Sequence, residues 1–264
     1  MQTPTASIEY HWPEYLMEAS GLGIFLFAAC AFGVLLGHPA SPVNQAISSD
    51  LVRRMLMGVA MGTTSICLVY SPWGQRSGAH FNPAFTLSYY FLGKVKGWDA
   101  IFYITAQFAG GVAGVFLADL IIGFPLRHSA VNYVVTVPGP AGPGTAFLAE
   151  ILISLTMMFT VLAVSNSKPL HRWTPLFAGF LVALYIAVES PVSGMSMNPA
   201  RTFGSAFPAQ DWNSLWVYFT APLLGMFAAG QLYRVRRGAN GIFCAKLYHP
   251  NGKRCIFRCN FAAL

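Results

Sequence analysis

Long apolar segments dominate this sequence and limit the folds that it can adopt. Six of them are long enough to cross a bilayer as helices, at about 14–37, 51–71, 98–122, 145–165, 173–190 and 212–234. Only 9% of the residues are charged, against about 25% in soluble domains. That shortage of charge excludes an ordinary soluble enzyme and a disordered chain. The sequence therefore predicts an all-α polytopic membrane protein with six transmembrane helices.

Two shorter apolar segments, about 82–92 and 198–208, each begin with the tripeptide Asn-Pro-Ala. The residues are Asn82, Pro83 and Ala84 in the first half and Asn198, Pro199 and Ala200 in the second. Asparagine is a good N-cap, and proline suits the first turn of a helix. Each segment is too short to cross a bilayer, which predicts two re-entrant half-helices. Non-helical backbone at that depth points to a pore or a central binding site.

The two halves of the chain follow the same order. Glu18 and Glu150 each lie early in the first span of a half, and each half then has a second span, an Asn-Pro-Ala segment and a third span. Because each half has an odd number of spans, the second half lies upside down relative to the first. This inverted 3+3 repeat would bring the two half-helices together from opposite faces, near the midplane.

Basic residues are distributed unevenly between the loops. With both termini on one side, that side holds Arg76, Lys94, Lys96, Lys168, Arg172, Arg234, Arg236, Arg237, Lys246, Lys253, Arg254 and Arg258, against Arg53, Arg54 and Arg127 on the other. Cytoplasmic loops are enriched in Lys and Arg, so both termini are expected in the cytoplasm. We interpret the net charge of +7 as membrane topology and not as nucleic-acid binding.

The first fifteen residues lack the basic region of a signal peptide and carry Glu9 and Glu14, so the first span is expected to remain in the mature protein. The lack of a signal peptide and of long loops favours a bacterial inner membrane, with the plasma membrane of another organism as the alternative.

Two helix N-termini that face one midpoint make a positive electrostatic barrier to cations. Asn82 and Asn198 can each direct a side-chain NH2 toward a passing water or hydroxyl oxygen, which interrupts a proton relay. Arg201 lies one turn after Asn198, and a charged side chain at membrane depth is a functional candidate. We interpret it as a pore filter. The alternative is a structural arginine bonded to backbone carbonyls.

On these residues the chain resembles the aquaporin, or major intrinsic protein, family. The resemblance covers about residues 14–236, including GAHFNPAFTL and MNPARTFGSAF. It implies one hourglass pore in each protomer of a homotetramer, and passive passage of water or small neutral solutes through the bilayer. It implies no cofactor and no nucleic acid, and the sequence has no nucleophile–base pair or phosphate loop that would suggest an enzyme.

The expected organisation is an N-terminal cytoplasmic segment at 1–13, a channel domain at 14–236 and a basic, cysteine-containing tail at 237–264. The two repeats of the channel domain cover about 14–125 and 145–236.

The resemblance also implies four positions for the outer constriction of the pore. Counting from the two asparagines gives Gly62, Ile186, Met195 and Arg201, with Met61 in place of Gly62 if the register shifts by one. This set lacks the aromatic and histidine residues typical of water-selective members, whereas Thr202 and Ala206 are similar to water channels and not to glycerol facilitators. An atypical, wider filter would admit glycerol, urea, ammonia or hydrogen peroxide, unless the flexible Met195 side chain folds across the pore.

Other polar and small residues have implied roles. Glu18 and Glu150 would each hold an Asn-Pro-Ala loop by accepting backbone N–H bonds, with a proton relay as the alternative. His80 would line the cytoplasmic vestibule, or bond a loop carbonyl as a buried histidine. Gly110 and Gly114 have the small-xxx-small spacing of closely packed helices.

The C-terminal tail is not lipid-like. Residues 242–248 and 255–261 flank a Pro-Asn-Gly turn at 250–252, a pattern that predicts a small β-hairpin. The set Cys244, His249, Cys255 and Cys259 is a candidate for zinc. It lacks close CxxC pairs, so reduced thiols that ligate nothing are the alternative. The basic residues of the tail also suit anionic lipid headgroups.

Two other functions are compatible with the pattern. A coupled secondary transporter can have inverted repeats and broken helices, but it needs an ion site or a titratable group at the midplane, where this chain has Asn, Pro and Ala. A closed, structural membrane protein would show no permeability in an intact tetramer.

Overall fold

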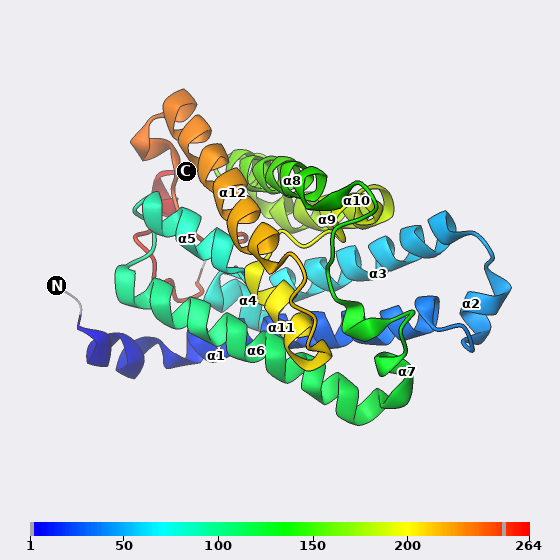
Figure 1. Ribbon diagram of the computed structural model, residues 1–264. Coiled ribbons are helices and arrows are strands. Elements are labelled where there is room, and N and C mark those ends of the chain that lie inside the picture. Colours follow the sequence, from blue (N-terminus) through cyan, green and yellow to red (C-terminus); the bar gives the residue numbers. More distant parts are fainter. Residues whose placement is uncertain (1–2, 250–251) are drawn as a thin grey trace.

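The structure is a computed structural model that describes residues 3–249 and 252–264, and it confirms the predicted all-α fold. Within these residues, six helices are long and apolar enough to cross a membrane. They are α1 (Pro4–Gly37), α3 (Asp50–Tyr70), α6 (Gly97–Ile122), α8 (Gly142–Ser165), α9 (Thr174–Val188, extended by the 3-10 turn His171–Trp173) and α12 (Leu215–Arg237), and they lie side by side in one bundle (Figure 1).

The two half-helices are α5 (Pro83–Phe91) and α11 (Pro199–Ala209). Both begin at the proline of an Asn-Pro-Ala tripeptide, as the sequence predicts. Short helices and 3-10 turns connect the longer elements: α2 (Pro42–Ala46), α4 (Pro72–Ser77), α7 (Phe124–Arg127), η1 (Asn132–Val134), η2 (His171–Trp173), α10 (Ser190–Ser193), η3 (Ala239–Gly241) and η4 (Phe261–Ala263).

The first helix is longer than the sequence predicts. It begins at Pro4, and the Thr3 side chain caps it by accepting a hydrogen bond from the Ala6 N–H at 3.2 Å. Residues 4–13 therefore belong to the same helix as the first predicted span. Thr before Pro is a favourable helix start, which explains why the helix begins at Pro4 in spite of the polar residues there.

The helix pairs follow the internal repeat. In the first half α1 packs on α6, in the second α8 packs on α12, and α3 packs on α9 between the halves. Glycines allow these close approaches: a Cβ at Gly110 would lie 2.0 Å from the Ala19 carbonyl oxygen, and one at Gly114 would lie 2.3 Å from that of Gly23. The small-xxx-small prediction for Gly110 and Gly114 is thus confirmed.

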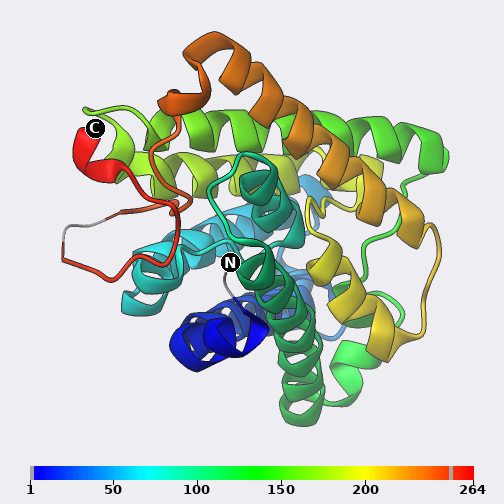
Figure 2. The ribbon, with the colours of Figure 1, turned by 90° about the vertical axis from the view of Figure 1, so that its left-hand side faces the viewer.

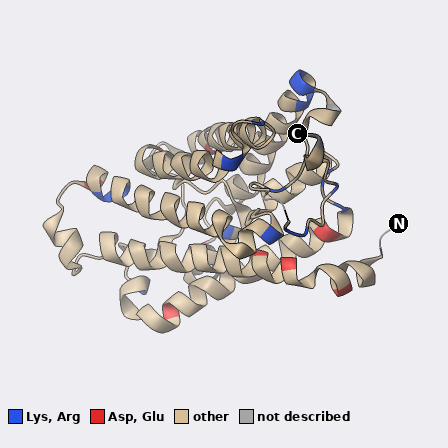
Figure 3. Cartoon of the chain, turned by 180° about the vertical axis from the view of Figure 1, so that it is seen from behind, with Lys and Arg blue, Asp and Glu red and all other residues tan. Residues whose placement is uncertain are grey.

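Both termini lie at one end of the bundle, and α2 and α7 lie at the other (Figure 1). We call these the tail end and the opposite end. Most Lys and Arg residues gather at the tail end (Figure 3). Figure 2 looks onto that end and shows the C-terminal residues lying over it.

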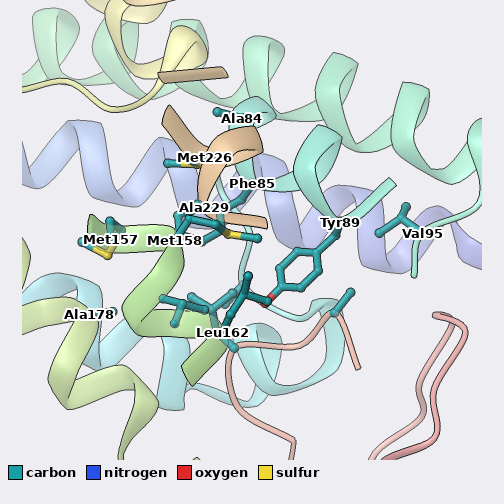
Figure 4. Packing of buried hydrophobic residues seen from close by; sticks show 14 of the residues in the cluster. Ala84, Phe85, Tyr89, Val95, Met157, Met158, Leu162, Ala178, Met226 and Ala229 are labelled. Carbon is teal, nitrogen blue, oxygen red and sulfur yellow. The ribbon is translucent and has the colours of Figure 1, made fainter. Parts of the chain in front are cut away.

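The main hydrophobic core joins the first half-helix to the second half of the chain. Tyr89 of α5, Met158 and Leu162 of α8 and Met226 of α12 are almost completely buried in it (Figure 4). Six residues of the tail belong to the same core: Ile242, Cys244, Ala245, Leu247, Ile256 and Phe257. The tail is therefore part of the folded bundle.

The predicted β-hairpin in the tail is wrong, because no strand occurs among the described residues. The turn predicted at 250–252 lies partly outside the described residues. The backbone of the tail bonds to distant loops instead: Leu247 N–H donates to Gly78 O at 3.1 Å, and Arg258 N–H donates to Lys94 O at 2.9 Å. These partners replace the ladder that a hairpin would need.

Candidate functional site

The N-termini of the two half-helices meet through reciprocal hydrogen bonds. The Asn82 amide NH2 donates to the Met197 carbonyl at 2.7 Å, and the Asn198 NH2 donates to the Phe81 carbonyl at 2.8 Å. Each carbonyl belongs to the residue just before the other asparagine. The Asn82 oxygen caps its own helix by accepting from Ala84 N–H at 2.8 Å. An amide NH2 has two donors, so each asparagine keeps one N–H beyond the bond across the junction.

Two buried carboxylates hold the loops that precede these asparagines. Glu18 accepts the backbone N–H groups of His80 at 3.1 Å and Phe81 at 2.6 Å. Glu150 accepts those of Ser196 and Met197, both at 2.7 Å. These are the contacts that the resemblance implies. Each carboxylate uses its oxygens to accept hydrogen bonds from its own loop. These bonds favour a structural role for Glu18 and Glu150 over a proton relay.

A cavity of about 330 Å³ passes this junction. Asn82 and Asn198 both line it. Leu247 of the tail lines it as well, together with Arg54, which lies near the start of α3 at the opposite end. The cavity therefore extends along the bundle, past the point where the half-helices meet.

Three of the four predicted filter residues line this cavity, namely Ile186, Met195 and Arg201. The fourth differs: among the described residues that form the wall, α3 contributes Met61 and not Gly62. Gly62 faces α9, where an added Cβ would lie 2.5 Å from the Gly179 carbonyl oxygen. The assignment of Gly62 is thus corrected to Met61. The register of α3 is thus the shifted one, which the sequence allowed as the alternative.

Arg201 has contacts that are compatible with both interpretations that the sequence left open. One guanidinium nitrogen, Nη1, donates to the Val134 carbonyl at 2.9 Å, and the residue lines the cavity. The side chain thus has a backbone acceptor that orients it, and it places a positive charge at the cavity wall. Guanidinium has five N–H donors, so a bond to Val134 leaves others for a passing oxygen.

His80 has contacts that are compatible with both of its predicted roles. It lines the cavity, yet only 3% of its surface is exposed. Its Nε2 donates to the Ala245 carbonyl of the tail at 2.8 Å. The Phe257 ring stacks on it, with centroids 5.3 Å apart and an angle of 10° between the planes. The tail is therefore bound directly to the loop of the first half-helix.

Sequence reasoning missed the residues that the tail and the loop before α8 contribute to the cavity. Leu247 and Val134 both line it. Val134 lies in a segment of positive φ, with Asn132 at 42° and Tyr133 at 53°, a conformation unusual for these residues. Neither position belongs to a motif, so the sequence carries no signal that would have identified them.

The candidate zinc ligands of the tail do come together. The ligand atoms of Cys244, His249, Cys255 and Cys259 all lie within 4.8 Å of one another. The hydrogen bond from the Cys244 thiol lowers the pKa of Cys255, although burial opposes this shift. Burial lowers the pKa of Lys246, whose ammonium donates to the Gln75 carbonyl at 2.8 Å and to the Arg254 carbonyl at 2.6 Å.

Comparison with known proteins agrees with this geometry. The family model described as "Major intrinsic protein" matches residues 5–233. The putative aquaporin NIP4-1 of Arabidopsis thaliana is 32% identical over 180 residues, which cover 68% of this chain and 62% of that protein. Aquaporin-4 of Rattus norvegicus is 33% identical over 224 residues, covering 84% of this chain and 66% of that one. The match thus spans less than two thirds of the length of these relatives.

A solved structure has the same fold. The X-ray structure of the aquaglyceroporin from Plasmodium falciparum superimposes with a TM-score of 0.67 at 21% identity, covering 84% of this chain and 95% of that chain. The six spans, the paired half-helices and the match over most of the sequence lead to one conclusion. This chain belongs to the major intrinsic protein family, and it is a multi-pass membrane protein of the aquaporin type.

Proposed function

We propose that this protein is a passive channel for water and small neutral solutes that excludes protons and ions. The observation that carries the proposal is the cavity that both Asn82 and Asn198 line, at the junction of two opposed helix N-termini. Related proteins in the same family are named as aquaporins. Members of this family are channels and not enzymes, which supports the non-enzymatic function.

Exclusion of protons follows from the polarity of the junction. Each helix N-terminus carries about half a positive charge. The free N–H groups of Asn82 and Asn198 would each donate to the oxygen of a passing water. A water that accepts two such bonds must direct its own hydrogens away, toward both ends of the pore, so a proton cannot be relayed through it. Arg201 adds a full positive charge at the wall.

The solute range depends on the constriction formed by Met61, Ile186, Met195 and Arg201. Three of these side chains are apolar, so the guanidinium is the principal donor there. Replacing Gly62 by Met61 in this set makes the constriction narrower than the sequence suggests, and methionine side chains can adapt their shape. We propose that water passes, together with small solutes such as ammonia, hydrogen peroxide, urea or glycerol.

The remaining assignments follow from family and charge. The basic residues at the tail end support a cytoplasmic location for both termini (Figure 3). We place the protein in the plasma membrane, or the inner membrane of a bacterium, as a homotetramer. The channel domain would cover residues 14–236, and the tail residues 237–264. Because the tail lies against His80, a closed or structural role is the second candidate function.

Liposomes containing the purified protein test the proposal by stopped-flow light scattering. A sucrose gradient should cause faster shrinkage than in empty liposomes, and a glycerol gradient then reports the solute range. Slow re-swelling in glycerol would mean that the methionines narrow the filter. Met61→Ala should speed glycerol entry, whereas Cys67→Ser, at an exposed site, should change nothing. An intact tetramer with no permeability above empty liposomes would overturn the open-channel proposal.

A further inference from the structure

Four metal-binding side chains converge in the tail, outside the pore. The sulfur atoms of Cys244 and Cys255 lie 3.5 Å apart, and Nε2 of His249 lies 3.2 Å from the Cys259 sulfur. All four ligand atoms lie within 4.8 Å of one another. Zinc–sulfur bonds of about 2.3 Å in a tetrahedron place ligand atoms about 3.8 Å apart. The four atoms therefore have the spacing that a tetrahedral zinc site needs, with only small adjustments.

The surroundings of the cluster also suit a structural metal. Cys244 is only 4% exposed, and it belongs to the main hydrophobic core. Three cysteines and one histidine are a ligand set typical of closed, structural zinc sites. Sequence spacing alone argued against zinc because close CxxC pairs are missing. In the fold, the pairing is made between two tail segments, 242–249 and 255–261, which is why the sequence pattern does not show it.

A disulfide between Cys244 and Cys255 is the competing chemistry. The five cysteines, all within the described residues, are free thiols. A disulfide would use two of the sulfur atoms and give no role to His249 and Cys259, although both are directed at the same point. Zinc uses all four groups. The convergence of a histidine with three thiols therefore favours the metal.

Both segments of the cluster are attached to the bundle. In the first segment, Phe243 N–H donates to Asn166 Oδ1 at 2.7 Å, and the Ala245 carbonyl accepts from His80. In the second, Phe257 stacks on His80 and Arg258 N–H donates to Lys94 O at 2.9 Å. A metal bound between the segments would join two groups of contacts at the same end of the cavity.

We propose that Cys244, His249, Cys255 and Cys259 bind one zinc ion, which ties residues 242–249 to residues 255–261 over the tail end of the cavity. Binding as thiolates releases the thiol protons to solvent and involves no change of oxidation state. The ion has a structural role, since four protein ligands leave no open position for a substrate. This inference concerns the tail and does not depend on what the pore conducts.

The first test is the metal content of the full-length protein, purified in detergent with a reductant and without chelators. Elemental analysis should find about one zinc per chain, as expected for one four-ligand site. Cobalt added to the metal-free protein should give the absorbance of tetrahedral thiolate coordination. Cys255→Ser and Cys259→Ser should weaken binding by more than the roughly 10- to 100-fold that loss of an outer-shell partner causes. Cys67→Ser, a matched control outside the cluster, should keep the metal.

A second measurement covers the case in which a serine variant fails to fold. Zinc is removed from the wild-type protein with a chelator and then restored, while amide hydrogen exchange is followed. Exchange should rise in residues 242–249 and 255–261, and return when zinc is added. The amides of His80 and Phe81, held by Glu18, should stay protected throughout. Reduced wild-type protein that binds neither zinc nor cobalt would overturn the proposal, as would a Cys244–Cys255 disulfide in the protein as isolated from reducing cells.

Discussion

The two loops that lead into the half-helices have almost the same internal bonding. In the first, the Ser77 hydroxyl donates to Glu18 at 2.7 Å, and in the second the Ser193 hydroxyl donates to Glu150 at 2.8 Å. Each carboxylate also accepts two backbone N–H groups of its loop. The two halves therefore fix their half-helices with the same set of hydrogen bonds to a buried carboxylate, and the junction between them is nearly symmetric.

The same two loops differ in what lies against them. The first carries His80, which is bonded to Ala245 and covered by Phe257. The second carries Met195 and leads to Arg201, which is held by Val134 and lines the cavity. The comparison teaches that the repeat sets the centre of the pore, where both loops must agree. The ends are free to diverge, one into a cavity wall that carries Arg201 and the other into a surface that holds the tail.

The largest expected effect on stability comes from the two carboxylates that hold the loops in the same way. Glu18→Gln and Glu150→Gln each replace a carboxylate oxygen with an NH2 that faces buried N–H donors. Each change should lower the free energy of unfolding by about 3 kcal/mol, because bonds to a charged acceptor are lost and donors are left unpaired. Thermal unfolding in detergent, followed by tryptophan fluorescence, measures both.

The exposed Glu9→Gln is the control for these variants and should change little. Equal losses of unfolding free energy in the Glu18 and Glu150 variants would support the view that both loops are held in the same way. A large loss at only one of them would mean that the two loops are held differently, in spite of their matching bonds.

The contact between α3 and α9 is a second place where the halves should behave alike. A Cβ at Gly62 would lie 2.5 Å from the Gly179 carbonyl oxygen, and one at Gly179 would lie 2.7 Å from that of Gly62. Gly62→Ala and Gly179→Ala should therefore each cost about 2 kcal/mol through overpacking. The same unfolding assay measures the cost.

Gly144→Ala is the matched control, since a Cβ there would meet no described atom within 4 Å. Gly62→Ala should also leave the ratio of glycerol to water permeability unchanged, whereas Met61→Ala should raise it. A changed ratio in Gly62→Ala with unaltered stability would return Gly62 to the filter.

These residues also show what could be predicted from the sequence. The spans and the half-helices follow from hydropathy, Asn-Pro-Ala and the repeat, because they depend on local or repeated patterns. The acceptor role of Glu18 and Glu150 follows from the resemblance to the aquaporin family. The choice between Met61 and Gly62 depends on the rotation of α3 about its axis, which counting residues from Asn82 does not fix. The structure of the tail depends on backbone partners such as Gly78 and Lys94. Those partners are far away in the sequence, so no local pattern records them.

A smaller effect is expected where the halves differ. Phe257→Ala removes the ring that covers His80 and should loosen the tail at the mouth of the cavity. Water permeability of liposomes should rise on the order of tenfold, the change that about 1.4 kcal/mol in the barrier produces. Phe124→Ala, at an exposed site of the opposite end, should leave permeability unchanged. If deletion of residues 242–264 has no more effect than Phe124→Ala, the tail does not obstruct the pore.

The smallest effect is expected from removal of the proposed zinc. The hydrogen bond from His80 to Ala245 and the stacking of Phe257 on His80 would remain. The tail should therefore become more mobile but stay attached to the bundle. Water permeability should rise by about threefold, which corresponds to roughly 0.6 kcal/mol. A membrane-permeant chelator applied to zinc-loaded liposomes measures this change. The water permeability of the Cys259→Ser variant should already be raised before the chelator is added, and the chelator should not change it further. A wild-type protein that loses zinc with unchanged permeability would show that the metal stabilises the tail without controlling access to the pore.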